Sequence, residues 1–295
     1  MKLNYFRLGS SALLLTLAAA CSPLGQQTAP APTSTAYADA TATRDGNLAL
    51  GNPSGAVTDA TNYPNNYLLA KSQYTMSYSR DQGKPNWVSW HLSAAWLGNT
   101  SRQDNFAADA ALPSAWYHVG STSYSGSGFD RGHNCPSADR TGSVADNSAT
   151  FLMSNMMPQA PTNNQQTWAN LENYCRTLVS AGNELYIIAG SYGKGGTGTN
   201  GTASTIDGGR ITVPSNCWKV VVVLPVGTSD ASRITSSTRV IAINTPNTNS
   251  VSTSWGSYRT TVDAIENATG YNLLSAVSST VQSSIESKTD TGPTN

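Results

Sequence analysis

The chain has 295 residues, and its 17 Lys and Arg residues equal its 17 Asp and Glu residues in number. A formal net charge of zero excludes a basic nucleic-acid coat protein whose affinity comes from bulk positive charge. Charged residues make up only 12% of the chain, but a hydrophobic content of 38% with 7 Trp is enough for a sizeable core, which excludes wholesale disorder.

The N-terminal residues 1–21 have the pattern of an export signal. Lys2 and Arg7 give a positively charged start, residues 12–20 form a short apolar run, and Cys21 follows. That run is too short to span a bilayer, and no later segment is long and apolar enough for a transmembrane helix. The Ala-Ala-Ala-Cys sequence fits a bacterial lipoprotein cleavage box, with Ala where Leu is usual, and it equally fits ordinary signal cleavage. We therefore expect an exported protein, either lipid-anchored in the cell envelope at Cys21 or freely secreted.

The rest of the chain divides into three parts. Residues 22–44 are rich in Ala, Pro, Thr, Ser and Gln without apolar periodicity, which predicts a flexible linker. Residues 45–288 contain no internal repeat and no second linker, so we expect them to form one folded domain. Residues 289–295 are expected to be a disordered tail.

In the first half of the domain, turn-forming residues separate segments 74–79 and 87–92, which predicts a hairpin. Residues 150–155 predict a short strand. Residues 164–181 predict a helix that ends at Gly182, because apolar side chains recur along one face at helical spacing.

In the second half, β-branched apolar runs predict strands in a sheet interior at residues 185–189, 217–224 and 239–244. Two further helices are expected at residues 261–268, ended by Gly270, and at residues 279–287. Strands mixed with a few helices, without regular βαβ alternation, indicate an α+β fold.

Titratable residues are concentrated in segment 129–141, which contains Asp130, Arg131 and His133. Such a cluster can be purely structural, but a second segment favours chemistry. Asn164 and Glu172 are eight residues apart, or about 80° around an ideal helix, and both border its apolar face. An Asn and a Glu turned toward the interior need polar partners, and a hydrated cation would supply them.

Together these segments resemble the DNA/RNA non-specific endonucleases, which are built on a ββα-metal finger. The resemblance runs from Gly51 to Tyr271, nearly the whole predicted domain. The Asp-Arg-Gly-His tetrad at residues 130–133 is specific in combination with the downstream Asn-Gln, Trp and Leu-Glu of the predicted helix. The resemblance implies that the finger is embedded in a mixed domain with a central, mainly antiparallel sheet flanked by helices.

The resemblance also implies a reaction centre. His133 matches the general base, which as a neutral imidazole takes a proton from the attacking water. Asn164 matches the one direct protein ligand of a divalent cation, expected to be Mg²⁺ with Mn²⁺ as a substitute, because Mg²⁺ keeps most of its waters. Glu172 matches an acid that orients those waters.

Four more residues have implied supporting roles. Arg102 and Arg131 match arginines that bind phosphate and offset charge in the transition state. Asp130 would position the neighbouring loop or hold the waters of the cation. Asn155 would organise the site through the backbone near His133.

The expected substrates are DNA and RNA, cut with little sequence preference because phosphate and sugar are contacted rather than base edges. The family's products carry 5′-phosphate and 3′-hydroxyl ends. Two alternatives remain, an exported nucleic-acid-binding protein on the same fold without catalysis and a non-catalytic surface-interaction protein. Basic residues that could line the groove are Lys71, Lys84, Arg102, Arg131, Arg140 and Lys219.

The cysteines leave their pairing open. If Cys21 is lipidated, three remain, and they allow three pairings with one thiol left over. Cys175 with Cys217 would join the predicted helix to a strand. Cys135 with Cys175 would instead tie the candidate catalytic loop to that helix.

Overall fold

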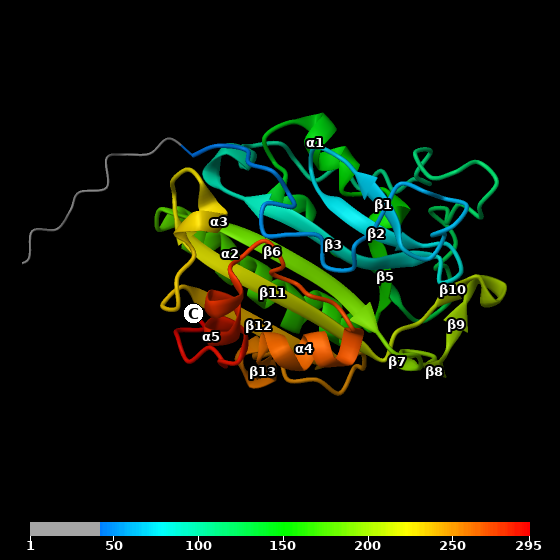
Figure 1. Ribbon diagram of the computed structural model, residues 1–295. Helices are drawn as coiled ribbons and strands as arrows, with labels where there is room; N and C mark the ends of the chain where they lie inside the picture. Colours follow the sequence, from blue (N-terminus) through cyan, green and yellow to red (C-terminus); the bar gives the residue numbers. More distant parts are fainter. Residues whose placement is uncertain (1–41) are drawn as a thin grey trace, which may run out of the picture. The chain divides into compact units, whose positions relative to one another are not determined.

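A seven-stranded antiparallel sheet forms the centre of the domain (Figure 1). The computed structural model describes residues 42–295, so the predicted export signal and nearly all of the predicted linker lie outside the described residues. In spatial order the strands are β1 (Tyr67–Ala70), β2 (Thr75–Ser79), β3 (Lys84–Leu92), β6 (Asn183–Tyr192), β11 (Asn216–Pro225), β12 (Arg239–Pro246) and β13 (Arg259–Thr260).

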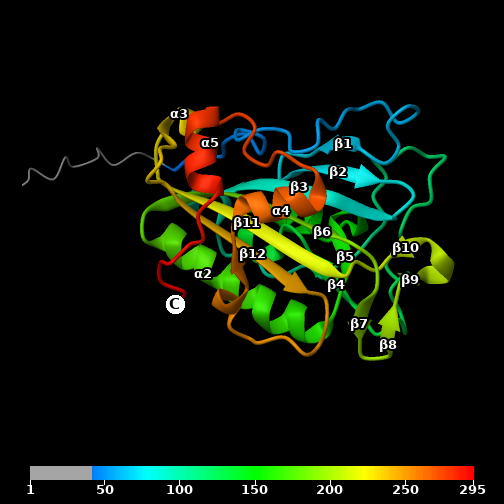
Figure 2. The ribbon, with the colours of Figure 1, turned by 60° about the horizontal axis from the view of Figure 1, so that its bottom comes forward.

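The two faces of the sheet bury separate hydrophobic cores, because successive side chains of a strand point to opposite faces. Ile187 and Ala189 of β6 belong to the core that also contains Leu171 and Cys175 of helix α2 (Ala169–Ser180). Tyr186 and Ile188 belong to the core beneath helices α4 (Val262–Thr269) and α5 (Ser279–Glu286). Figure 2 shows α2 on one side of the sheet and α4 and α5 on the other.

The ββα unit lies on the α2 side of the sheet. Strand β4 (Asp130–His133) pairs antiparallel with β5 (Met156–Gln159), and a π-helical segment, Asn163–Trp168, leads directly into α2. The tetrad requires its glycine, because a Cβ at Gly132 would lie 2.7 Å from Cβ of Gln159 and 3.0 Å from the Met157 carbonyl oxygen across the strand pair. The predicted α+β fold with a ββα finger is therefore confirmed.

Shorter elements complete the domain at its edges. Along the chain, helix α1 ends shortly before β5, and α3 follows β11. Two small antiparallel strand pairs come after β6 and before β11 in the sequence. Their bounds are α1 (Val144–Ala149), α3 (Asp230–Arg233), β7 (Gly196–Gly198), β8 (Gly201–Ala203), β9 (Thr205–Ile206) and β10 (Ile211–Thr212). No helix in residues 42–295 is long and apolar enough to cross a membrane.

Most predicted elements are present, with shifted ends. The hairpin, the three buried strands and the two C-terminal helices are confirmed. The strand predicted at residues 150–155 is wrong: Thr150 caps α1 with a 2.7 Å bond from Oγ1 to the Asn147 carbonyl, and Met153–Asn155 is a 3₁₀ turn. The helix predicted at residues 164–181 begins as the π-helical segment and becomes α-helical only at Ala169.

The two ends of the predicted domain also differ from expectation. Arg44, assigned to the linker, pairs with Asp146 at 3.0 Å. In the segment expected to be a disordered tail, Asp290 is buried and receives two 2.9 Å hydrogen bonds from Arg239 of β12. This ion pair attaches the C-terminal residues to the sheet.

No disulfide joins the described cysteines. Cys135, Cys175 and Cys217 are all free thiols, and all three are buried. Neither of the two pairings proposed from the sequence is therefore present, and the cores hold these residues as small apolar side chains.

Candidate active site

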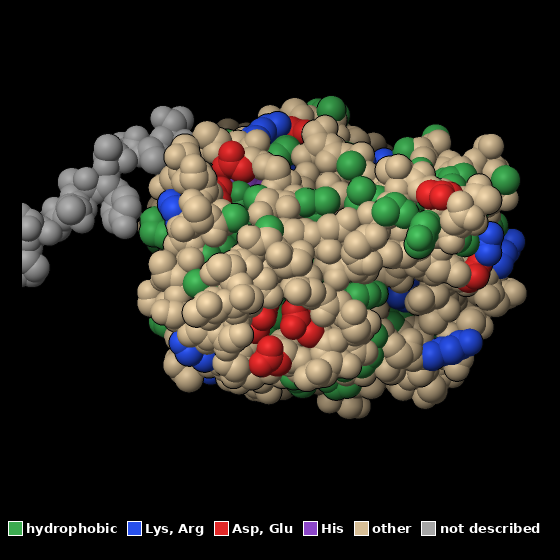
Figure 3. Space-filling view, in the orientation of Figure 1, with side chains coloured by type: hydrophobic (Ala, Val, Ile, Leu, Met, Phe, Trp, Pro, Cys, Tyr) green, Lys and Arg blue, Asp and Glu red, His purple; other side chains and the backbone are tan. Residues whose placement is uncertain are grey.

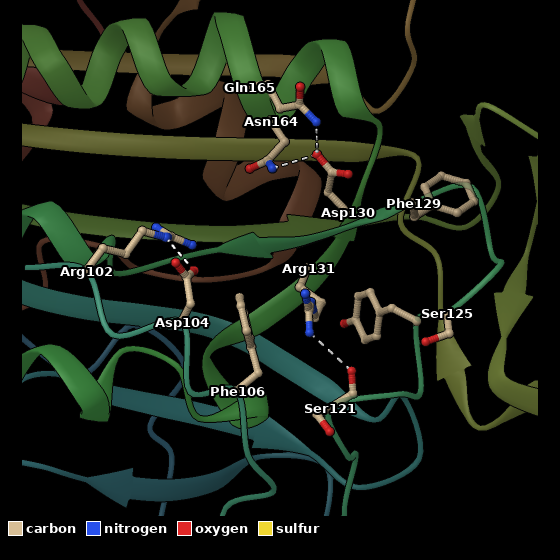
Figure 4. A pocket seen from close by; sticks show the side chains of 11 residues that line it. Arg102, Asp104, Phe106, Ser121, Ser125, Phe129, Asp130, Arg131, Asn164 and Gln165 are labelled. Carbon is tan, nitrogen blue, oxygen red and sulfur yellow. Dashed lines mark hydrogen bonds and ion pairs between the residues drawn. The ribbon is translucent and has the colours of Figure 1, made fainter.

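A pocket of about 430 Å³ lies where β4 meets the π-helical segment and the loops that precede β4 (Figure 4). Most of its lining side chains are polar or aromatic, and two of them are arginines. The lining residues are Arg102, Asp104, Phe106, Ser121, Tyr124, Ser125, Phe129, Asp130, Arg131, Asn164 and Gln165.

Asp130 on β4 connects the two secondary-structure elements of the pocket. Its Oδ2 accepts a 2.9 Å hydrogen bond from Nδ2 of Asn164 and a 2.8 Å bond from Nε2 of Gln165. Figure 4 shows both amides directed toward this carboxylate. Because Nδ2 of Asn164 is committed to Asp130, the amide oxygen is turned away from it and makes no hydrogen bond within residues 42–295.

The two arginines of the pocket are held by aromatic rings as well as by hydrogen bonds. The guanidinium carbon of Arg131 lies 3.7 Å from the ring centroid of Phe106, and its NH1 donates to the Ser121 carbonyl at 3.2 Å. The guanidinium carbon of Arg102 lies 4.7 Å from the ring centroid of Phe151.

Arg102 also has two polar contacts. Its Nε pairs with Oδ1 of Asp104 at 2.6 Å, and NH1 donates to Oγ of Ser137 at 2.9 Å. The Arg102 side chain is 50% exposed, and the Asp104 side chain is 61% exposed. An exposed ion pair of this kind is weak and exchanges readily with solvent. The guanidinium is therefore accessible to an anionic ligand.

His133 packs against the same two aromatic rings, whose centroids are 4.9 Å from each other. Its ring centroid is 5.7 Å from that of Phe106 and 5.1 Å from that of Phe151, both in edge-on geometry. Its Nε2 is buried and has no hydrogen-bond partner among the described residues. Burial lowers the pKa of His133 to about 3, and the positive charges of Arg102 and Arg131 act in the same direction. The imidazole is therefore neutral at physiological pH.

The backbone on both sides of His133 is fixed from behind. Nε1 of Trp168 donates a 3.2 Å hydrogen bond to the His133 carbonyl. The fully buried Asn155 bonds the backbone of Cys135 twice, accepting from N at 3.0 Å and donating to O at 2.8 Å. It also donates to the Thr150 carbonyl at 2.9 Å. Asn155 thus holds the loop after β4 in place and does not line the pocket.

Glu172 lies on α2 but does not line the pocket. Its Oε1 pairs with Nζ of Lys219 at 3.2 Å, and that ammonium lies 4.2 Å from the ring centroid of Trp168. Burial raises the pKa of Glu172, and the charge of Lys219 opposes this shift. The glutamate is therefore connected through Lys219 and Trp168 to the backbone of His133.

Comparison with known proteins identifies the group to which this pocket belongs. The sequence model of the DNA/RNA non-specific endonuclease family matches residues 52–280. The chain belongs to this family.

Relatives with the word nuclease in their names support the assignment. A nuclease from Nostoc sp. is 49% identical over 279 residues, which cover 95% of this chain and 96% of that protein. Human mitochondrial endonuclease G is 30% identical over 54% of this chain and 56% of its own length. A chain in the crystal structure of the EndoG/EndoGI complex superimposes on this protein with a TM-score of 0.62 and 22% identity. The match covers 81% of this protein and 94% of that chain, which shows a shared fold.

As a member of this endonuclease family, the chain brings only part of its predicted site to the pocket surface. The pocket is lined by Asp130, Arg131, Arg102 and Asn164. His133 contacts the rings of Phe106 and Phe151. The other two predicted residues, Asn155 and Glu172, do not line the pocket. Of the other basic groove candidates, Lys84, Arg140 and Lys219 are buried, and Lys71 pairs with Asp109 at 2.9 Å.

Sequence reasoning missed two residues of this endonuclease site and assigned no role to a third, the glutamine of the Asn-Gln pair. Phe106 and Phe151 contact both a pocket arginine and His133, and Gln165 shares Asp130 with Asn164. The adjacency of Gln165 to Asn164 was a usable signal. Nothing in the sequence near the two phenylalanines distinguishes them from ordinary core residues.

Proposed function

We propose that this endonuclease hydrolyses phosphodiester bonds of both DNA and RNA with little sequence preference and leaves 5′-phosphate ends. The observation that carries the proposal is the arrangement of two arginines and a neutral histidine around two shared phenyl rings, next to the Asp130–Asn164 pair. Groups that bind phosphate therefore lie next to a group that can accept a proton.

His133 is the general base in this proposal. A base must be neutral before the reaction, and burial together with two nearby positive charges keeps the imidazole unprotonated. A phosphate between Arg102 and Arg131 would offset those charges and raise the pKa of His133 toward its ordinary range. The imidazole would then become a better proton acceptor once substrate is bound.

Arg102 and Arg131 bind the phosphate in this proposal. Each guanidinium is planar and is oriented by a phenyl face, so its N–H groups are held in a fixed direction. Charge builds up on the phosphate oxygens in the transition state, and preoriented donors stabilise it more than mobile ones would. Because these contacts involve phosphate alone, they carry no base preference.

A divalent cation, Mg²⁺ or in its place Mn²⁺, fits the residues present. The amide oxygen of Asn164 is a hard donor, makes no hydrogen bond within residues 42–295 and is oriented by the bond from Nδ2 to Asp130. When bound, such a cation would stabilise negative charge on the scissile phosphate and the leaving oxygen. Asn164 would hold it and Asp130 would keep the amide from rotating. The role of Glu172 in orienting water around the cation stays a prediction.

Plasmid and RNA degradation test the proposal. Supercoiled plasmid and a mixed-sequence RNA are incubated with purified protein in Mg²⁺ or in EDTA. We expect both polymers to be cut in Mg²⁺ only, and His133→Ala to lower the rate about 10²–10⁴-fold while DNA binding persists. Arg80→Ala, at an exposed arginine that does not line the pocket, serves as the control and should cleave normally. Binding without cleavage by the parent protein would favour a non-catalytic binding protein.

We also propose that the enzyme is exported, on the strength of the charged start and apolar run before Cys21. Either lipid attachment at Cys21 or free secretion is consistent with that sequence. Cell fractionation of a bacterial host that expresses the parent and Cys21→Ser distinguishes the two. A lipoprotein should move from the membrane to a soluble exported fraction in the variant, and retention of both proteins in the cytoplasm would contradict export.

A further inference from the structure

Three carboxylates meet between the helices on the face of the sheet opposite the pocket. Asp263 and Glu266 lie one turn apart on α4, and Glu286 is the last residue of α5. One carboxylate oxygen from each residue lies within 4.8 Å of the others. Figure 3 shows a group of acidic side chains on this face, in the region where Figure 1 places α4 and α5.

These negative charges have no compensating partner. Within residues 42–295, no Lys, Arg or His side chain forms an ion pair with Asp263, Glu266 or Glu286. Glu266 accepts one hydrogen bond through Oε1, from the Leu273 amide at 2.7 Å. Removing a carboxylate charge from water without a positively charged partner costs free energy. The cluster would therefore be stabilised by a bound cation.

Glu286 is the carboxylate of the cluster with the fewest favourable contacts. The residue is only 5% exposed, and its Oε1 is buried without a hydrogen-bond partner among the described residues. It also stands at the C-terminus of α5, where the helix dipole disfavours a negative charge. Burial and the charges of Glu266 and Asp263 raise its pKa to about 7.

A second acidic group in the protein differs in this respect. Glu184 and Asp230 lie close to His91 and Asp45, but both bind Arg233, at 2.5 Å and 2.6 Å. A guanidinium therefore already supplies the positive charge there. The contrast shows that the α4–α5 cluster is distinguished by its lack of a cation, not by its acidity alone.

We propose that Asp263, Glu266 and Glu286 form a binding site for Ca²⁺ that joins α4 to α5. The donor set consists only of oxygens, which favours a hard cation over Zn²⁺ or Cu²⁺. Oxygens bound to one Ca²⁺ at about 2.4 Å can be at most about 4.8 Å apart, and the three carboxylate oxygens lie within that limit. The site stabilises the domain and takes no part in cleavage, because the sheet separates it from the pocket.

Thermal unfolding at pH 7.5 tests the site in protein treated with EDTA, with CaCl₂ added up to 10 mM. The protein measured is the Asn164→Ala variant, because this substitution removes the proposed ligand of the catalytic cation and leaves the α4–α5 cluster unchanged. Ca²⁺ should raise Tm by about 3–6 °C with a saturating dependence. Calorimetric titration of the same protein should give one binding event, and Mg²⁺ should raise Tm less.

Adding Glu286→Gln to Asn164→Ala separates a cation site from a merely structural carboxyl. The amide keeps the side-chain shape and removes one charge, so in EDTA the double variant should unfold at an equal or higher temperature. It should also lose the Ca²⁺ response and the calorimetric signal. Glu266→Gln in the same background should lose them too, whereas Asp81→Asn, at an exposed carboxylate outside the cluster, should keep them.

Three results of the cation titrations would overturn the proposal. They are no saturable Ca²⁺ response in Asn164→Ala, an equal response after Glu286→Gln is added, and an effect of Mg²⁺ as large as that of Ca²⁺. A lower Tm of the double variant in EDTA would indicate that a protonated Glu286 stabilises the fold by itself, which also contradicts a cation site.

Discussion

Oδ2 of Asp130 accepts a 2.9 Å hydrogen bond from Nδ2 of Asn164, so a residue of β4 sets which way an amide of the next helix faces. An isolated Asn side chain can turn its amide by half a rotation at little cost. Here the carboxylate accepts only from an N–H group, so the amide oxygen is left for a ligand.

Asp130→Ala should therefore weaken metal dependence without removing the metal ligand. We expect the Mg²⁺ concentration for half-maximal cleavage to rise about 10–100-fold, the usual cost of losing a group that orients a ligand. Asn164→Ala should raise it further, and Asp81→Asn should leave it unchanged. Metal titrations of initial cleavage rates measure all three. If the Asp130→Ala curve overlays that of the parent, the carboxylate does not orient the amide.

Glu172→Gln should also shift the Mg²⁺ titration, but it should have a second effect. Loss of the charge leaves the buried Lys219 unpaired, which costs stability. Lys219→Met removes the ammonium that lies over the Trp168 ring and keeps an unbranched side chain of similar length, so it separates the two effects. A role for Glu172 at the metal predicts a shifted titration in Glu172→Gln and a smaller one in Lys219→Met. Equal shifts in the two variants would assign Glu172 to positioning Trp168 and the His133 backbone alone.

The pH profile of kcat/KM should report the protonation of His133 in the free enzyme. A histidine with a pKa of about 3 is neutral at all higher pH, so its protonation should cause no acid limb between pH 8 and pH 5. Arg102→Ala removes one of the two positive charges that lower this pKa but leaves burial, the larger cause, in place, so the pKa should rise only in part and the acid limb should move to higher pH in a profile extended below pH 5. Arg80→Ala is the control. An acid limb near pH 6.5 in the parent, unmoved by Arg102→Ala, would contradict this electrostatic coupling.

Cleavage should depend weakly on salt and hardly at all on base sequence. Two pocket arginines neutralise about two phosphates, which gives a log–log slope of binding against salt near −2. Arg102→Ala and Arg131→Ala should each slow cleavage of all sequences by about 10²–10³-fold. Cut sites mapped on one mixed-sequence duplex check this for the parent and both variants. A short recognition sequence in the parent, or a changed site preference in a variant, would show that bases are read.

Asn155→Ala should destabilise the whole domain rather than the chemistry alone. It leaves buried backbone groups of Cys135 and Thr150 without partners, which should cost at least about 2 kcal/mol of unfolding free energy. Asn170→Ala, which removes one exposed bond to the Thr253 carbonyl, should cost less than about 0.5 kcal/mol. Urea unfolding measures both. Similar losses in the two variants would contradict a special role for Asn155.

The sequence allowed prediction of the main sheet strands, because they depend on short-range periodicity. It also singled out the tetrad and Asn164 by residue type, and the structure joins them through the Asp130–Asn164 hydrogen bond. It did not allow prediction of β4, since two charged residues, Gly and His do not form an apolar strand pattern. The angle expected between Asn164 and Glu172 assumed an ideal α-helix. The π-helical segment adds a residue to the turn and rotates Asn164 relative to α2, and periodicity does not reveal such a turn.

The phenylalanines illustrate a different limit. Phe106 lies in an irregular loop and Phe151 in a turn, more than forty residues apart, and they meet around His133 only because of how the chain folds. The residues next to each phenylalanine in the sequence do not indicate which distant side chain it will contact. The ion pair between Asp290 and Arg239 was missed for the same reason, since its partners are 51 residues apart.

The three buried thiols have a practical consequence. Burial raises the pKa of Cys135, Cys175 and Cys217 to about 12 each, so almost no thiolate forms at neutral pH and alkylating reagents cannot reach it. Within residues 42–295, a cysteine introduced on the surface would thus be the single site open to a maleimide dye. A fluorophore could be attached beside the pocket without first removing Cys135, Cys175 or Cys217, and reducing agents could stay in the buffer until labelling without breaking a crosslink between these three.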